Sequence, residues 1–249
     1  MYRFTLLSVF CLLLFPPAAP AQGVKRYSSA YHNLENTFEP LPDRPNVYLV
    51  TIEKDGSALL DPPGAAEAKT VTIGRLKDFF ISLAAKTNSP DSTRGKDLVS
   101  FRPDPSVRID TVIAFVETAR NTYTSKIRIE AEEGVFARVP MKPGPYPRTV
   151  VKPNPLTLVV SADKSGALRL NGENQGNLSD TLKLTNILKT IFRERENNGV
   201  FREQTNIIET TVFLKLPLST TWGDAAKVVR AVYDGGGDPI GLQIENLDK

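Results

Sequence analysis

Hydrophobic and polar positions follow the same order twice along this chain. Residues 47–60 and residues 156–170 each contain an apolar, β-branched run, a charged turn that ends in glycine, and a second apolar run. Gly56 and Gly166 stand at the turns, where glycine readily adopts the positive φ that a tight hairpin requires. The pattern therefore predicts two β-hairpins.

A helical period follows each hairpin. Apolar side chains recur at positions i, i+3, i+4 and i+7 from Leu76 to Leu83, and again from Leu184 to Ile191. A stripe of this kind packs one face of a helix against a core. Each segment therefore predicts an amphipathic helix.

A short strand, a second helix and a last strand complete each copy. The short strands are expected at residues 98–101 and 211–216, and apolar stripes beginning at Ile109 and Trp222 predict the second helices. The closing strands contain the similar tetrapeptides IRIE and LQIE at equivalent places. The copies lie about 110 residues apart, a common domain size.

Polar residues at the helix starts predict caps. Ser106 is expected to cap the second helix of the first copy, and Thr221 with Asp224 three residues later approximates a capping box. Trp222, the only tryptophan, is expected to pack in the core more readily than to form a ligand platform.

These elements predict an α+β protein with two tandem two-layer domains. Each domain reads ββαβαβ, with two helices on one face of a small mixed sheet. The expected organisation is a signal peptide, a proline-marked arm, a first domain, a proline-rich linker and a second domain, at residues 1–21, 22–45, 46–133, 134–155 and 156–249.

Three consecutive glycines, Gly235, Gly236 and Gly237, raise the question of nucleotide binding. Glycines that bind phosphate follow a strand and open a helix, whereas these follow a helix and precede a strand. They lie at the negative end of the helix dipole, which disfavours an anion. We therefore expect a helix C-cap with positive φ, followed by a turn.

The N-terminus predicts export. Arg3 precedes an apolar run at residues 4–15, and two prolines and small residues follow, so we expect a signal peptide cleaved before Gln22. The alternative is an uncleaved anchor. The only cysteine, Cys11, lies in this segment, so the mature protein would be periplasmic and free of disulfides.

Candidate chemistry is sparse. The net charge of +3 is spread along the chain, which gives no sign of a nucleic-acid surface. His32 is the only histidine and lies in the arm, so neither an ordinary zinc site nor a Ser-His-Asp triad is expected. We predict no catalytic, cofactor or metal residues and favour a binding role. The alternative is a hydrolase that uses carboxylates paired in space.

The second copy resembles the periplasmic domain of the ExbD/TolR biopolymer-transport family. The resemblance lies in LTLVVSADKSGALRLNGE and in WGDAAKVVRAVYDGGGDPIGLQIE, which ends in the Ile-Gly-Leu strand typical of the family. It covers residues 156–247, and the first copy resembles the same domain more faintly. Such proteins pair with ExbB/TolQ-type membrane partners and use the proton gradient to act on TonB-like or TolA-like proteins.

The sequence departs from this family at the residue that couples to protons. Family members carry an aspartate in their transmembrane helix, whereas residues 4–15 contain Ser8 and Cys11 but no acid. The resemblance therefore implies an accessory envelope component that binds proteins or peptidoglycan, without proton translocation. An N-terminally anchored transporter subunit is a further alternative.

The repeat also suggests an internal pair. Single-domain relatives act as pairs, and a short tether raises the effective concentration of two linked units to the millimolar range. We therefore expect an intramolecular pseudo-dimer, with its two sheets packed or edge-paired, and a monomer in solution.

Overall fold

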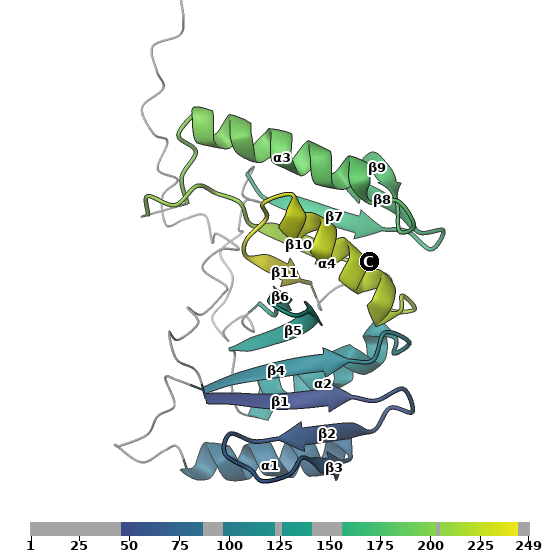
Figure 1. Ribbon diagram of the computed structural model, residues 1–249, viewed down its shortest axis with the longest axis vertical. Helices are drawn as coiled ribbons and strands as arrows, with labels where there is room; N and C mark the ends of the chain where they lie inside the picture. The colour runs from purple at the N-terminus through teal and green to yellow at the C-terminus, as the bar shows by residue number, and fades with distance from the viewer. Residues whose placement is uncertain (1–45, 87–96, 123–125, 141–155, 203–204, 244–249) are drawn as a thin grey trace, which may run out of the picture.

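The computed structural model describes residues 46–86, 97–122, 126–140, 156–202 and 205–243. Within these ranges the chain forms four helices and one mixed sheet of 11 strands (Figure 1), so the predicted α+β class is confirmed. The expected signal peptide and proline-marked arm, with Cys11 and His32, lie outside the described residues.

The first half of the chain contributes six strands and two helices. In chain order they are β1 (Asn46–Ile52), β2 (Ala58–Asp61), β3 (Lys69–Val71), α1 (Ile73–Lys86), β4 (Asp97–Pro103), α2 (Ile109–Thr122), β5 (Ile127–Glu132) and β6 (Val135–Arg138).

The second half contributes five strands and two helices. They are β7 (Leu158–Ala162), β8 (Ala167–Leu170), β9 (Glu173–Asn177), α3 (Leu182–Asn197), β10 (Val212–Lys215), α4 (Trp222–Asp234) and β11 (Ile240–Leu242).

The sheet is continuous across both halves, with the strand order β3-β2-β1-β4-β5-β6-β11-β10-β7-β8-β9. It differs from the predicted small sheets in two ways. A third strand, β3 or β9, follows each hairpin, and β6 lies within the stretch that was expected to be a linker. Gly134, at φ +77°, turns the chain from β5 into β6, so the apolar positions of β6 reach the core instead of solvent.

The strand pairs of the two halves have the same register. Val50 of β1 lies opposite Phe101 of the parallel strand β4, and Val160 of β7 lies opposite Leu214 of the parallel strand β10. The hairpins and the last parallel pairs follow the same scheme. Among the described strands, only β6 has no counterpart in the other half.

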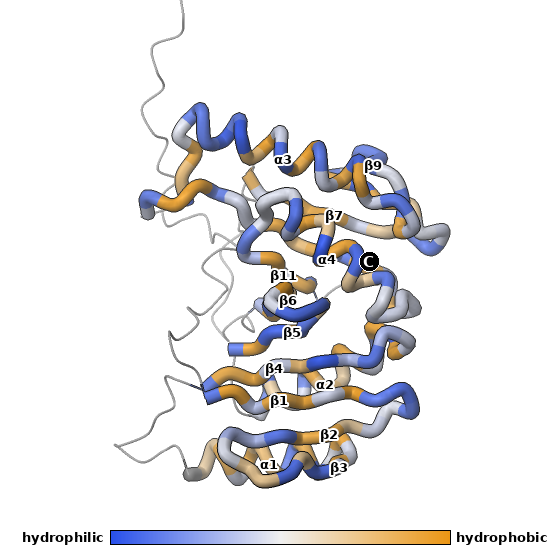
Figure 2. Tube along the Cα trace, viewed as in Figure 1, coloured by the Kyte–Doolittle hydropathy of each residue, from blue (hydrophilic) through white to orange (hydrophobic). Residues whose placement is uncertain are grey.

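The helices cover one face of this twisted sheet. In Figure 1, α1 and α2 lie behind the lower strands, whereas α3 and α4 lie in front of the upper ones. Neighbouring strands are rotated relative to each other by about 20–25°. The same face of the sheet therefore points away from the viewer at the lower end of Figure 1 and toward the viewer at the upper end. Helices α2 and α4 are in contact near the middle of the sheet. Strand residues such as Val50, Phe101 and Ile129 are fully buried in the core that the sheet shares with the helices. Figure 2 shows how apolar and polar residues are distributed along these elements.

The two hairpin turns are built in similar ways. Gly56 and Gly166 adopt φ values of +80° and +82°. The Asp163 carboxylate accepts hydrogen bonds from the Ser165 hydroxyl at 2.5 Å, the Ser165 backbone N–H at 2.9 Å and the Ala167 backbone N–H at 3.1 Å. These bonds, that of the Ser165 hydroxyl above all, hold the pKa of Asp163 below its ordinary value of 3.8.

Replacing Ser165 with alanine should raise the pKa of Asp163 toward 3.8, because the largest stabiliser of its charged form is removed. An NMR pH titration of the aspartate side chains measures this shift. Asp55 in the other hairpin serves as an internal control, since its pKa should not change. The lowered pKa of Asp163 stabilises the folded state at pH values above the pKa of this group in the unfolded chain. This stabilisation is lost as the pH falls through the pKa of Asp163 in the folded state. In the variant it should be lost at a higher pH.

The glycine run differs from its prediction in detail. Gly235 ends α4 with φ −75°, and only Gly236 adopts positive φ, at +92°. Glycine is instead required at positions 235 and 237 because neighbouring atoms leave no room for a side chain. A Cβ atom on Gly235 would lie 2.8 Å from Leu188 Cβ, and one on Gly237 would lie 2.6 Å from Val232 Cγ1. The run therefore allows the end of α4 to pack closely against α3.

Replacing Gly235 with alanine should lower the free energy of unfolding by about 1–3 kcal/mol, because the added methyl group overpacks the contact with Leu188. Gly74 is the matched control. It lies in α1, and an added Cβ has its nearest neighbour, Thr72 Oγ1, at 4.0 Å. Alanine at Gly74 should raise stability by about 0.5–1 kcal/mol. Urea denaturation compares the two, and a stable Gly235→Ala protein would contradict the packing argument.

Candidate functional site

The helices α2 and α4 begin at two loops that bind each other. The Ile109 N–H at the start of α2 donates to the Thr220 carbonyl at 2.9 Å. The Trp222 N–H at the start of α4 donates to the Val107 carbonyl at 2.6 Å. Each helix therefore begins on the loop that precedes the other helix.

A second pair of bonds repeats this exchange one residue further along. The Asp110 N–H donates to the Leu218 carbonyl at 3.2 Å, and the Gly223 N–H donates to the Pro105 carbonyl at 2.8 Å. The first N–H groups of a helix have no partner within the helix. Here the opposite half of the chain satisfies two of them in each helix. We call these four bonds the seam.

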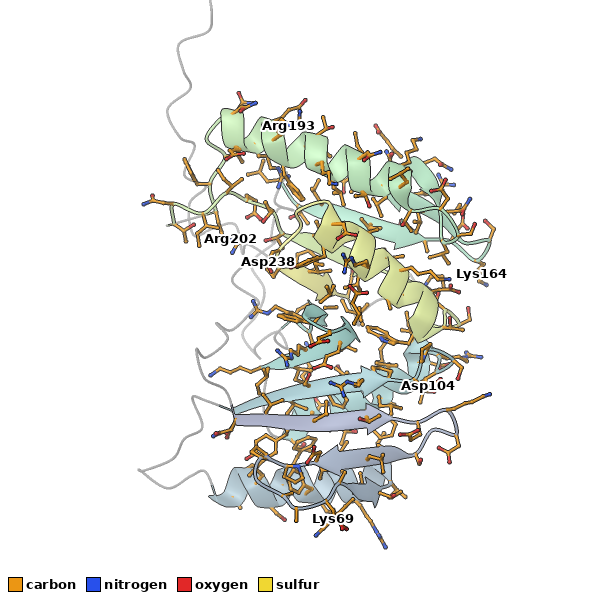
Figure 3. The ribbon with its side chains drawn as sticks, in the orientation of Figure 1. Lys69, Asp104, Lys164, Arg193, Arg202 and Asp238 are labelled. Carbon is orange, nitrogen blue, oxygen red and sulfur yellow. The ribbon has the colours of Figure 1, made fainter. Side chains whose placement is uncertain are left out.

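The predicted caps lie at the seam. Thr221 Oγ1 accepts the Asp224 N–H at 3.3 Å, while the Asp224 carboxylate accepts from Lys227 Nζ at 2.8 Å. The prediction for Ser106 is wrong. The Ser106 hydroxyl donates to the Asp104 carboxylate instead of capping a helix; Asp104 is labelled in Figure 3. Helix α2 begins only at residue 109. The opposite loop replaces the missing side-chain cap.

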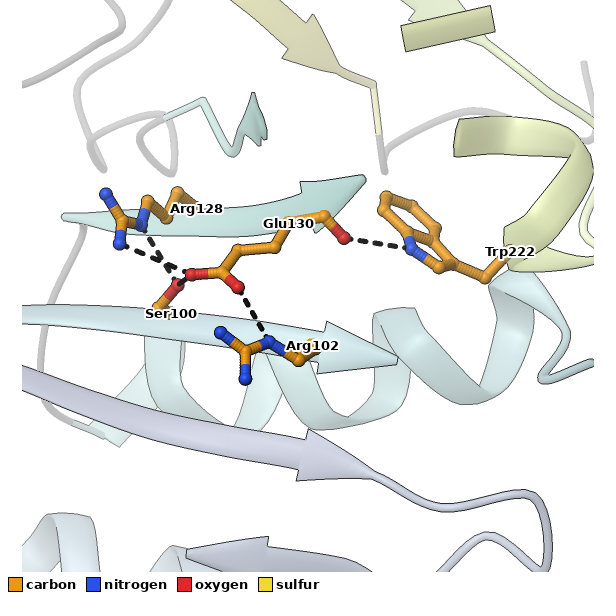
Figure 4. A network of polar contacts seen from close by, with 5 residues as sticks. All are labelled: Ser100, Arg102, Arg128, Glu130 and Trp222. Atoms are coloured by element: carbon orange, nitrogen blue, oxygen red, sulfur yellow. Dashed lines mark hydrogen bonds and ion pairs between the residues drawn. The ribbon is translucent and has the colours of Figure 1, made fainter. Parts of the chain in front are cut away.

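Trp222 adds a side-chain contact between the halves. The residue is 2% exposed, and its Nε1–H donates to the Glu130 carbonyl on β5 at 3.1 Å. Figure 4 shows the indole of α4 reaching over to the end of this strand. The only tryptophan of the chain is thus a core residue that joins α4 to the first half.

A polar network lies on the helix-free face of β4 and β5 (Figure 4). The Glu130 carboxylate accepts from Arg102 Nε at 2.8 Å, from the Ser100 hydroxyl at 2.8 Å and from Arg128 Nη2 at 3.3 Å. Arg128 Nε also donates to the Ser100 hydroxyl at 2.9 Å, and the guanidinium lies 5.0 Å from the Phe136 ring centre. One carboxylate therefore orders two arginines. We call Ser100, Arg102, Arg128 and Glu130 the arginine network.

A groove of about 730 Å³ is lined by residues of α3, α4 and the end of β5. Its acids are already engaged. The Asp180 carboxylate accepts the Leu182 N–H at 3.1 Å, while Asp234 and Glu132 both pair with Arg230. The carboxylates of the groove therefore serve as a cap and as ion-pair partners.

The charged run at the end of α3 contains a buried residue that the sequence reasoning missed. Arg195 lies between two glutamates in the sequence, yet it is only 8% exposed. Its guanidinium donates to the Glu209 carbonyl at 2.7 Å and to the Leu156 carbonyl. Arg202, labelled in Figure 3, similarly donates to the Asp238 carbonyl at 2.9 Å. Both arginines fasten the α3–β10 connection and have a structural role.

The two edges of the sheet differ. At β9, Lys183 Nζ occupies the Asn174 carbonyl at 2.8 Å, and Asn177 forms a bridge with Asp180. At the other end, β3 pairs with β2 and with no other strand of the described ranges. Within the described part of the chain, the β3 edge is therefore the more accessible of the two to an added strand.

Comparisons with protein-family models, curated proteins and solved structures gave no match. None of the helices in the described ranges combines the length and the apolar character that a membrane crossing needs. The same ranges contain no group of three or more His, Cys, Asp or Glu side chains placed to hold a metal ion.

Replacing Trp222 with phenylalanine should lower the free energy of unfolding by about 1–3 kcal/mol, because the part-buried Glu130 carbonyl loses its donor. Urea denaturation followed by circular dichroism measures the change. Tyr233→Phe in the same helix is the control, since Tyr233 is 49% exposed and should tolerate the change. Equal stability of the two variants would show that the indole contact does not hold the halves together.

Proposed function

We propose that this chain is a non-catalytic, exported binding protein whose two halves form an ExbD/TolR-like pair within one polypeptide. The seam is the observation that supports the proposal most strongly. Ile109 of the first half occupies the position that Trp222 occupies in the second half, and Val107 corresponds in the same way to Thr220. Under this correspondence, the bond from Ile109 to Thr220 becomes the bond from Trp222 to Val107, and the reverse is also true. Contacts that exchange in this way are the mark of a two-fold interface.

The strand registers support the same matching. Val50 with Phe101 corresponds to Val160 with Leu214, and both pairs are parallel. Each half is then a tandem unit built on the predicted ββαβαβ plan, with an added edge strand. In this proposal β6 joins the last strand of one unit, β5, to the last strand of the other, β11.

Two features of the described surface support a binding role. The acids of the groove are engaged in caps and ion pairs, whereas the β3 edge and the helix-free face of the sheet present groups to a partner. We propose an accessory part of a proton-motive-force-linked envelope system in the periplasm. Its partners would be ExbB/TolQ-like or TonB/TolA-like proteins, with peptidoglycan as an alternative, and it would not translocate protons itself.

Crosslinking in intact cells, followed by identification of the captured protein, tests this function. We expect the wild-type chain to capture a protein of the ExbB/TolQ or TonB/TolA type. Gly223→Val should reduce the capture several-fold, because a Cβ on Gly223 would lie 3.0 Å from the Pro105 carbonyl oxygen and would disturb the seam.

Gly64→Val is the control for this experiment. Gly64 lies in an exposed turn, has positive φ and has no atom within 4 Å of an added Cβ, so its replacement strains the backbone without touching the seam. Failure of the wild-type chain to capture any such envelope protein would refute the proposed function. Equal capture by the wild type and Gly223→Val would refute the paired arrangement as its basis.

A further inference from the structure

We infer that Arg102 and Arg128 form a receptor for side-chain carboxylates of an acidic segment of a partner protein, which binds to the helix-free face of β4 and β5. This inference rests on the proposed binding function and names the chemistry of the partner. It is carried by the geometry, charge balance and exposure of the arginine network.

The network contains one anion fewer than it has cations. Glu130 is its only carboxylate, and its two oxygens are shared between Arg102 and Arg128. Two guanidinium groups around one carboxylate leave a net positive charge. A second carboxylate, supplied from outside, would restore the alternation of charge and neutralise the cluster.

Arg102 is placed to supply that contact. A guanidinium carries five N–H donors, and within the described residues Arg102 uses only Nε, toward Glu130. Its side chain is 58% exposed. The terminal amino groups are therefore available in the planar, forked arrangement that matches a carboxylate.

The receptor is also fixed in position before any partner arrives. Glu130 is 15% exposed on its side chain and Ser100 is fully buried, so both anchor the arginines from below. Phe136 supports the Arg128 guanidinium at 5.0 Å. Holding a flexible side chain in its bound geometry lowers the entropy lost on binding.

The charge of the site favours an acidic protein segment over a nucleic acid. Duplex DNA carries one negative charge per about 1.7 Å of its axis, and its binding needs a long basic stripe. Here two arginines share one acid, which gives a small, local excess of positive charge. An extended peptide presents side chains on one face at intervals of about 6.6 Å, so a few carboxylates can reach the network.

Binding of a fluorescein-labelled hexaglutamate peptide to the full chain, measured by fluorescence anisotropy at low salt, tests the inference. Arg102→Gln should weaken binding about tenfold, because a charge-assisted pair is lost. Arg102→Lys, which keeps the charge but loses the fork, should fall between that variant and the wild type. Circular dichroism confirms that each variant is folded.

Arg169→Gln is the matched control. Arg169 lies on β8, six strands from β4; its side chain is 47% exposed, and it pairs with Asp163 at 3.9 Å. Its replacement should leave peptide binding unchanged. An equal loss in Arg169→Gln, or none in Arg102→Gln, would overturn the inference, since binding would then depend on overall charge or lie elsewhere.

Two competitors separate the other sources of negative charge. An oligothymidylate of the same charge, or vesicles containing phosphatidylglycerol, should displace the peptide poorly, and efficient displacement by either would overturn the inference. The cellular crosslinking keeps the two proposals apart. Partner capture that Arg102→Gln leaves intact would reject the arginine receptor and retain the proposed function, whereas loss of capture in Arg102→Gln but not in Arg169→Gln would support both.

Discussion

The exchange of backbone hydrogen bonds between the starts of α2 and α4 is the interaction on which the rest of the structure depends. Each helix needs acceptors for its first N–H groups, and each finds them in the loop before the other helix. Because the bonds are reciprocal, neither helix start is complete without the other half. This places α4 over β5, so that Trp222 reaches the Glu130 carbonyl and both halves share one core.

Much of the fold could be predicted from local patterns. Helical periods, hairpin glycines and the alternation of residues 126–130 give the types of most elements, because these signals depend on neighbours in the chain. The strands β3 and β9 were missed, since they are short and polar, as edge strands often are. The strand β6 was missed because prolines follow it closely, so it was read as part of the linker.

The candidate site was harder to predict, because it depends on register. Alternation in β5 already places Arg128 and Glu130 on one face of a strand. Arg102 and Ser100 join them only through the parallel pairing of β4 with β5, in which Ser100 lies opposite Arg128. No local signal carries that register. The reasons for Gly235 and Gly237 are similar, since both are set by the close approach of other side chains and not by their own φ angles.

The unlike ends of the sheet limit how copies of this protein can associate. A fibre of stacked molecules needs two complementary free strands on each copy, so that every addition exposes a new one. Here Lys183 occupies one carbonyl at the β9 edge, whereas β3 ends the described sheet with no such side-chain contact among the described residues. Contact between two open ends consumes both and stops growth at two copies. The Lys183 side chain at the β9 edge is thus a feature that disfavours the addition of a further strand there.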